Sequence, residues 1–196
     1  MMQGVALTGL SAFKSSWACK ERLAYATATQ TPYLVIYDGK IEQSAKFGQA
    51  AHRQSRSAAI DGDLSELWRR QLRSQMAHCP VPFAGLTTPL SLFCFRELAK
   101  THWMSVSLYA EHTPFGTASI RHTLHAPKNI LQQFGRRIRE GGLWSEIMAD
   151  MIARSPSRLD SCVTAAIYTP NRLAASIREP LVSWVIAPRV DSTKVS

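Results

Sequence analysis

Arginine is the residue whose number and spacing in this chain could do the most chemistry. Two windows contain basic residues and no acid, one from Leu67 to Arg96 and one between Glu111 and Glu140. A region of one charge sign creates a local positive potential, which is typical of phosphate binding. The sequence therefore predicts nucleic-acid contacts from basic side chains of these windows, namely Arg69, Arg70, Arg73, Arg121, Lys128, Arg136, Arg137 and Arg139. The alternative is that folding brings acids close enough to pair with several of them.

Two aromatic residues lie at the start of the second window. Tyr109 and Phe115 flank a turn that is expected at Glu111 to Pro114. An exposed aromatic ring beside positive charge stacks on nucleic-acid bases. Both residues are therefore predicted to stack on bases, whereas core packing is the better explanation for most other aromatic residues of the region.

Histidines could supply a metal site or proton transfer. His102, His112, His122 and His125 fall on one predicted hairpin and its flanks, so some are expected to meet in space. Together with Cys79 and Cys94 they include the ligand types of a zinc site, but their spacings match no familiar zinc pattern. Metal-independent RNA cleavage by His122 with His125 or His102 is possible chemistry that nothing in the sequence requires.

One acidic arrangement bears on a metal-dependent nuclease. Asp38, Gly39 and Lys40 follow a predicted strand, and Glu21 lies upstream, which is a loose form of an acid and D-x-K pattern. Turn geometry explains an Asp-Gly pair between two strands better. The chain also has no glycine-rich phosphate loop, no G-x-S-x-G and no H-E-x-x-H. We therefore predict no catalytic residue, no metal and no cofactor, and an enzyme is the less favoured interpretation.

Charge supports a polyanionic partner. The chain has 196 residues, with 23 Lys and Arg against 14 Asp and Glu, and a net charge of +9. Its pI is near 9.8. Arginine outnumbers lysine, and guanidinium binds phosphate bidentately and stacks on bases. GC-rich prokaryotic genes also encode arginine often, so the excess of arginine over lysine is only partial support for phosphate binding.

Cysteine usage and hydropathy bear on the compartment. Cys19, Cys79, Cys94 and Cys162 are scattered and form no C-x-x-C pair, which is unlike a disulfide scaffold. The first thirty residues lack the basic and then apolar pattern of a secretory signal, and no stretch approaches the roughly 20 apolar residues of a membrane span. The sequence predicts a cytoplasmic protein with no membrane partner.

The pattern of elements predicts an α+β fold. Strand-like residues and the Asp38-Gly39 turn predict a hairpin over about 33–44, and alternation predicts a second hairpin over about 103–124. Residues 45–60 are expected to be a loop. Helices are predicted from Asp63 to before Pro80, from Thr88 to about Lys100, from Pro127 to Gly141, and over Leu143–Ile152, which has the apolar stripe of a core helix. Residues 159–168 are predicted as helix or strand, 181–187 as a strand, and the segment to Gln30 as a weak helix. Antiparallel hairpins packed against amphipathic helices, without regular βαβ alternation, make an α+β fold.

The length suits a single domain over 1–196. The Gln-, Ser- and Arg-rich stretch before Asp61 is the one plausible boundary, so a small N-terminal lobe over 1–60 with a main body over 61–196 is the alternative.

These features predict a non-catalytic nucleic-acid-binding protein. We expect it to act with other protein subunits in a larger prokaryotic nucleoprotein assembly, for example an RNA-guided antiviral complex of the CRISPR type. Two alternatives stay open: a nuclease acting on DNA or RNA, and an inhibitor or effector whose basic face binds an acidic protein. DNA and RNA are not distinguished at this level.

Overall fold

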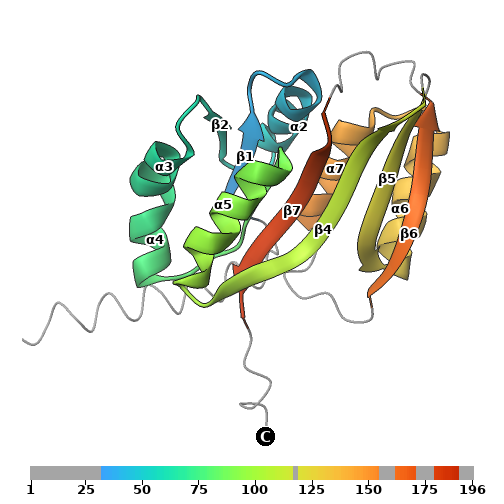
Figure 1. Ribbon diagram of the computed structural model, residues 1–196. Coiled ribbons are helices and arrows are strands. Elements are labelled where there is room, and N and C mark those ends of the chain that lie inside the picture. Colours follow the sequence, from blue (N-terminus) through green and yellow to red (C-terminus); the bar gives the residue numbers. More distant parts are fainter. Residues whose placement is uncertain (1–31, 117–118, 155–161, 171–178, 190–196) are drawn as a thin grey trace, which may run out of the picture.

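The computed structural model describes residues 32–116, 119–154, 162–170 and 179–189. Their strands form one mixed, mostly antiparallel sheet in the order β2-β1-β3-β7-β4-β5-β6 (Figure 1). The strands are β1 (Leu34–Asp38), β2 (Ser57–Ile60), β3 (Phe83–Thr87), β4 (Met104–Phe115), β5 (Ser119–Pro127), β6 (Cys162–Pro170) and β7 (Leu181–Pro188). The sheet and the helices packed on it confirm the α+β prediction.

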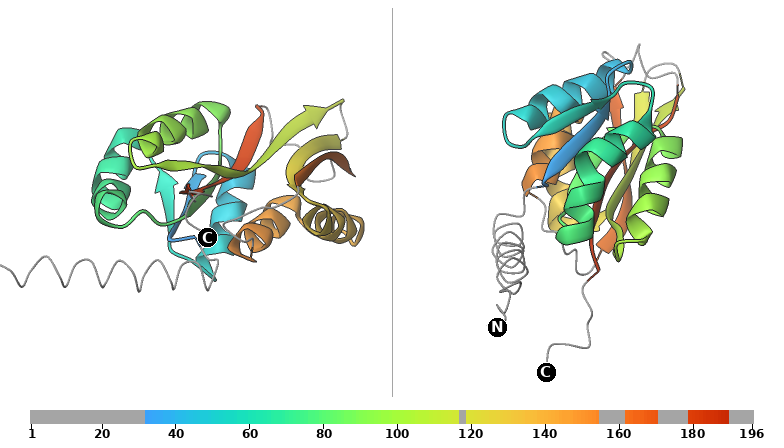
Figure 2. Two further views of the ribbon diagram at one scale, coloured as in Figure 1. Left: turned by 90° about the horizontal axis from the view of Figure 1, so that it is seen from below. Right: turned by 90° about the vertical axis from the view of Figure 1, so that its left-hand side faces the viewer.

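Helices lie on both faces of this sheet (Figure 2). One face carries α5 (Pro89–Lys100) and the continuous segment made of α3 (Leu64–Leu67), a π-helical turn (Trp68–Leu72) and α4 (Arg73–His78). The other face carries α2 (Glu42–His52), α6 (Lys128–Arg139) and α7 (Trp144–Arg154). The sheet therefore separates two hydrophobic cores.

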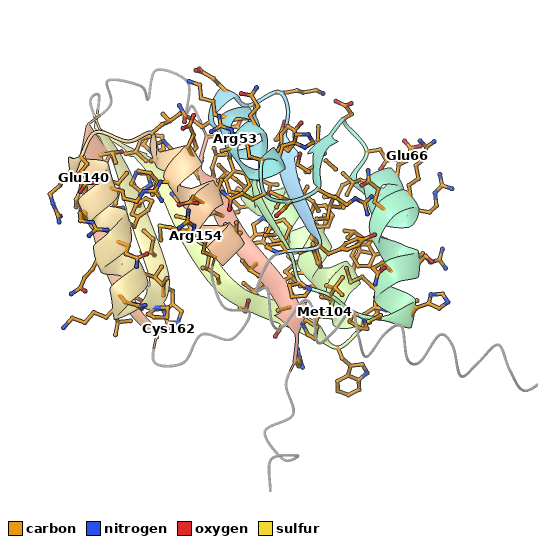
Figure 3. All side chains as sticks on the ribbon, turned by 180° about the vertical axis from the view of Figure 1, so that it is seen from behind. Arg53, Glu66, Met104, Glu140, Arg154 and Cys162 are labelled. Atoms are coloured by element: carbon orange, nitrogen blue, oxygen red, sulfur yellow. The ribbon has the colours of Figure 1, made fainter. Side chains whose placement is uncertain are left out.

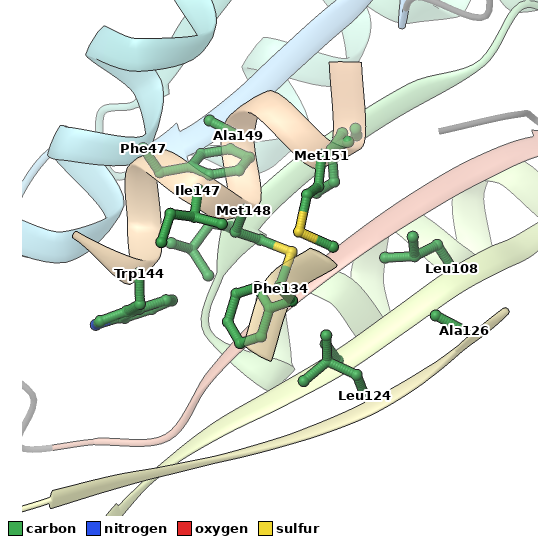
Figure 4. Packing of buried hydrophobic residues seen from close by; sticks show 14 of the residues in the cluster. Phe47, Leu108, Leu124, Ala126, Phe134, Trp144, Ile147, Met148, Ala149 and Met151 are labelled. Atoms are coloured by element: carbon green, nitrogen blue, oxygen red, sulfur yellow. The ribbon is translucent and has the colours of Figure 1, made fainter. Parts of the chain in front are cut away.

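Each core is built around aromatic side chains. On the α5 side, Phe83, Phe95 and Trp184 are fully buried, and the rings of Phe83 and Trp184 meet edge-on with centroids 5.6 Å apart. On the α7 side, Phe47, Phe134 and Trp144 pack with the apolar side chains of α7 (Figure 4). The burial of α7 confirms the prediction of a core helix over Leu143–Ile152.

Local capping explains where two predicted helices begin. The side chain of Asp63 accepts a hydrogen bond from the Ser65 N–H at 2.8 Å, and Thr88 accepts one from the Ser91 N–H at 3.3 Å. Pro89 occupies the first turn of α5, where a missing N–H costs nothing. These caps confirm the predicted starts of both helices.

The predicted hairpin over 33–44 is wrong. Strand β1 pairs in parallel with β2 and β3, and the chain after Asp38 turns into helix α2. Ser44 is the physical reason: its hydroxyl accepts the Asp38 N–H at 2.7 Å and donates to the Leu86 carbonyl. That buried bridge fixes the first turn of α2 against the ends of β1 and β3, so Lys40–Ser44 cannot extend as a strand.

The segment 45–60, predicted as a loop, contains most of α2 and all of β2. Helix α2 buries Phe47, Gly48 and Ala51 at helical spacing. Strands β1 and β2 lie in the same sheet as the strands after residue 61. The predicted hairpin over 103–124 is confirmed as β4 and β5, with Tyr109 opposite His125 and Phe115 opposite Ser119. The turn expected at Glu111 to Pro114 is wrong, because these residues continue β4, where Glu111 pairs with both β5 and β7.

The two halves of the sheet differ in cover. Every residue of β3 is buried, and so are the first seven of β7, because helices pack on both faces there. In β5 buried and accessible residues alternate along the strand. We call β2, β1, β3 and β7 the covered half, and β4, β5 and β6 the half-open half. Among the described residues, no helix is long and apolar enough to cross a membrane.

Candidate nucleic-acid interface

The half-open half presents one face of three strands that the described helices leave largely uncovered (Figure 1). Its side chains follow from the register: Tyr109 lies opposite His125 and then Thr164, and Thr113 lies opposite Arg121 and then Tyr168. The residues between them, such as Ala110, Ile120 and Leu124, are buried on the α6 and α7 side. We call the exposed side the open face; it comprises Tyr109, Glu111, Thr113, Phe115, Ser119, Arg121, Thr123, His125, Thr164, Ala166 and Tyr168.

Two aromatic side chains on the open face are half-exposed to solvent. Phe115 is 50% exposed and Tyr168 is 51% exposed. They reach toward each other across β5, with ring centroids 5.2 Å apart and planes 62° apart. A folded chain loses hydrophobic free energy by leaving two large rings in water, and such exposure is informative when the rings gather on one surface. The pair provides a platform on which bases can stack.

Tyr168 was not predicted to be a site residue. The segment around it was predicted only as helix or strand. Unless that segment is known to be a strand, the side of the sheet on which Tyr168 lies cannot be assigned. Exposed and less exposed residues alternate along β6 from Thr164 to Tyr168, and this alternation is the feature that assigns Tyr168 to the open face.

Tyr109, the other predicted stacking residue, is half-buried. Its hydroxyl donates to Glu111 Oε1 at 2.7 Å. Burial, and then the hydrogen bond and charge of Glu111, raise the pKa of Tyr109 to about 12. The phenol therefore stays neutral at physiological pH, and its ring lies on the open face near the first part of β4.

Arg121 is the predicted cation that the structure places beside the aromatic pair. It is exposed and lies directly opposite Tyr168 on β6 and Thr113 on β4. Among the described residues it makes no ion pair of 4.0 Å or less. On the same face, the His125 imidazole makes a 3.1 Å hydrogen bond with the Thr164 hydroxyl. Arg121, Tyr109 and Phe115 thus share one surface, as a phosphate- and base-binding site requires.

The remaining predicted arginines lie elsewhere. Arg69, Arg70 and Arg73 are on the segment α3 to α4, where Arg70 pairs with Glu66 at 2.6 Å and Arg69 lies 4.0 Å from it. Glu66 and Glu140, at the end of α6, mark opposite ends of the molecule (Figure 3). The structure therefore does not join Arg69, Arg70 and Arg73 into one patch with the cations of the second window.

Helix α6 carries the other four predicted cations, Lys128, Arg136, Arg137 and Arg139, on the sheet side opposite the open face. Arg136 lies 3.8 Å from Glu140 in an exposed i,i+4 pair. Arg137 donates to Asp150 of α7 at 2.5 Å. Acids brought close by folding thus partner two of the four, which is the alternative that the sequence left open.

Asp150 is the centre of a small ionic cluster that joins α6, α7 and the residues just after α2. Its carboxylate also accepts from Gln54 at 3.2 Å and from Arg154 at 2.9 Å. Partial burial acts to raise the pKa of Asp150, but the hydrogen bonds from Gln54 and Arg137 and the charge of Arg154 outweigh it and lower the pKa. The cluster links helices that pack on the same face of the sheet.

Two histidines do meet, but in the core. His112 and His122 are fully buried, with their Nδ1 atoms 2.7 Å apart. Their Nε2 atoms bond to the hydroxyls of Ser183 at 2.8 Å and Thr169 at 3.0 Å. Burial lowers the pKa of His112 well below its ordinary value and that of His122 to about 3. Both rings are therefore neutral, so one Nδ1 must donate its proton to the other. The two histidines, Ser183 and Thr169 form a chain of four hydrogen-bonded side chains, and the Trp144 ring packs against both imidazoles.

The other chemical candidates are separate. His102 packs near the Trp68 ring, and His125 is on the opposite sheet face from the buried pair. Asp38 accepts the Lys40 N–H at 2.9 Å, as a turn requires, while Glu21 lies outside the described residues. No group of three or more His, Cys, Asp and Glu residues in the described part of the chain could hold a metal ion.

Comparisons with protein-family models, with characterised proteins and with solved structures find no match to this chain. The open face is therefore the feature of this chain that points to a function.

Proposed function

We propose that the protein binds single-stranded nucleic acid on its open face. The observation that carries the proposal is the half-exposed Phe115 and Tyr168 pair beside Arg121, a cation that has no ion pair among the described residues. Proteins that bind single strands combine aromatic stacking platforms with positive charge along the backbone path. A sheet surface with exposed aromatic residues is also how one common class of RNA-binding domain holds its bases.

The shape of the surface favours a single strand over a duplex. Bases of a duplex are stacked on one another, so rings standing on a sheet cannot reach their faces. A single strand can lay unstacked bases on Phe115 and Tyr168 while its phosphates approach Arg121 and His125. The net charge of +9 adds long-range attraction to any polyanion.

We further propose that the protein is a non-catalytic member of a larger prokaryotic nucleoprotein assembly, for which an RNA-guided antiviral complex is one example. Three of the titratable groups with possible catalytic chemistry have structural partners: Asp38 accepts the Lys40 N–H in a turn, and His112 and His122 bond to each other in the core. A binding role uses the exposed groups and needs none of these.

Fluorescence anisotropy with labelled single-stranded DNA, single-stranded RNA and duplex tests the proposal. Phe115→Leu and Tyr168→Leu remove a ring but keep an apolar side chain, and each should weaken single-strand binding about 5- to 150-fold, since stacking contributes about 1–3 kcal/mol per base. Arg121→Ala should lower the salt dependence of binding by about 0.7 in the log–log slope, as expected for one phosphate contact to a single strand.

Arg53→Ala is the matched control, because Arg53 is exposed at the end of α2 on the opposite side of the sheet (Figure 3). Its effect should be small and uniform across substrates. Equal affinities for the wild type, Phe115→Leu and Tyr168→Leu would overturn the proposal, as would stronger binding to duplex than to either single strand.

A further inference from the structure

A cavity of about 420 Å³ lies between α5 and the first part of β4. This size is within the range of about 300–1,000 Å³ that is typical of small-molecule sites. Its floor is apolar, with Leu92 from the helix and Met104 and Val106 from the strand. An apolar floor with a few polar groups at the edge is the usual composition of a ligand site.

The polar groups of this cavity are mainly cations. Arg96 and Lys100 come from α5, and Arg189 comes from the residue after β7. Glu97 faces two of them: it accepts from Lys100 at 2.7 Å and lies 3.3 Å from Arg96. Arg189 makes no ion pair of 4.0 Å or less with a described residue. Three cations against Glu97 and the Glu111 carboxylate, which accepts from the Tyr109 hydroxyl, still leave the cavity with a net positive charge, which favours an anionic ligand.

Two aromatic rings line the same cavity. Phe93 is 51% exposed, and the Arg96 guanidinium lies over its ring at 5.5 Å from the centroid. Tyr109 contributes its half-buried ring from the strand side. A planar aromatic group in the cavity can therefore contact Phe93 or Tyr109 while a phosphate on it reaches a guanidinium.

We propose that this cavity binds a nucleoside monophosphate unit, with its base against Phe93 and Tyr109 and its phosphate at Arg96, Lys100 and Arg189. Two sources share this chemistry: a free nucleotide, or the phosphorylated end of a strand. Tyr109 lines the cavity and also belongs to the open face, so a strand on that face has a continuous path into it. The strand-end source rests on the proposed function, whereas binding of a free nucleotide does not.

Isothermal titration of the whole protein with adenosine monophosphate, adenosine and inorganic phosphate tests the composite site. The monophosphate should bind at least tenfold more tightly than either fragment. Arg96→Ala, Arg189→Ala and Phe93→Ala alter exposed or rim positions and should each weaken it at least fivefold, while Arg53→Ala should not. Equal affinity for phosphate and monophosphate would overturn the proposal, as would equal losses in Arg96→Ala and Arg53→Ala.

Oligonucleotides of one sequence with a 5′-phosphate, a 3′-phosphate or two hydroxyl ends distinguish the sources. Tighter binding of one phosphorylated form, lost in Arg96→Ala, identifies a strand end as the source. Monophosphate binding without any effect of end phosphorylation identifies the free nucleotide. Strand binding that is sensitive to Tyr168→Leu, together with no monophosphate binding and no end effect, overturns the cavity proposal alone. Monophosphate binding without strand binding overturns the open-face proposal alone.

Discussion

The covered half and the half-open half belong to one sheet but differ in how their strands are buried. In the covered half β3 and β7 are buried on both faces, and their sequences read as nearly continuous apolar runs. In the half-open half β5 alternates buried and accessible residues, with Leu124 inward and Thr123 outward. The covered half therefore contributes mainly to stability, whereas the half-open half keeps one row of side chains in contact with water.

Close packing in the covered half leaves no room for new atoms. A Cβ on Gly85 of β3 would lie 2.6 Å from the Ile36 carbonyl oxygen and 2.6 Å from the Trp184 ring. In the half-open half, by contrast, Phe115 and Tyr168 have a free side on which a ligand can stack. Four predictions test this division, beginning with the largest effect.

Gly85→Ala should lower the free energy of unfolding by more than about 3 kcal/mol, because the backbone of β1 and a buried indole must both move. Chemical denaturation measures the change. Gly39→Ala is the matched control, since a Cβ there would meet only Ala59 at an ordinary 3.6 Å. Similar small losses in both variants would contradict close packing at the centre of the covered half.

Substitutions on the two faces of β5 should have very different effects on the free energy of unfolding. Leu124→Ala should cost about 3 kcal/mol of unfolding free energy, as is usual for a buried leucine, whereas Thr123→Ala, one residue away on the open face, should cost less than about 0.5 kcal/mol. Urea denaturation of both variants gives the comparison. A comparable loss in Thr123→Ala would show that the open face is covered.

Acid should destabilise the half-open half through its buried histidines. The unfolded chain protonates histidine below about pH 6.5, while folded His122 stays neutral until about pH 3. The free energy of unfolding should therefore fall as pH decreases through this window, by about 1.4 kcal/mol per pH unit, or about 2 kcal/mol at pH 5, for His122. His112 shifts in the same direction and adds to the loss.

Denaturation at pH 7.5 and pH 5.0 measures this dependence. His122→Gln keeps hydrogen-bonding groups without the titration and should make the dependence clearly shallower. His125→Gln, on the open face, should leave it unchanged. A wild type that is equally stable at both pH values would contradict a buried neutral pair.

The smallest effect should come from the ionic cluster behind the sheet. Arg137→Ala should reduce the free energy of unfolding by about 1 kcal/mol, because it removes one of three groups that hold the Asp150 carboxylate. Single-strand affinity of this variant should fall no more than in Arg53→Ala. A selective loss of affinity with full stability would instead assign Arg137 to binding, as the sequence predicted.

Local signals allowed much of the fold to be predicted. The caps at Asp63 and Thr88 and the alternation of the β4–β5 hairpin act over a few residues, so they can be recognised without the fold. The prediction of a hairpin over 33–44 was wrong because an Asp38-Gly39 pair suits either a hairpin turn or the start of a helix. What decides it is the Ser44 contact with Leu86, 42 residues away.

The candidate site was predictable only in part, for a related reason. Tyr109 and Phe115 lie on one strand, so alternation places them on a common face once β4 is known to run to Phe115, whereas the place of Arg121 depends on its pairing with Thr113. The link from Arg121 to Tyr168 requires the pairing of β5 with β6, and the cavity requires α5, β4 and the end of β7 together. The acid-free windows could not reveal that Asp150 pairs with Arg137 through the packing of α7.

Photocrosslinking of a bound single strand, followed by mass spectrometry of the crosslinked peptides, locates the binding surface without any substitution. Binding on the open face should give crosslinks within 104–127 and 162–170, above all at Phe115 and Tyr168, and these should disappear when an unlabelled strand competes. Crosslinks confined to 64–78 or 128–139, where the other predicted arginines lie, would contradict it.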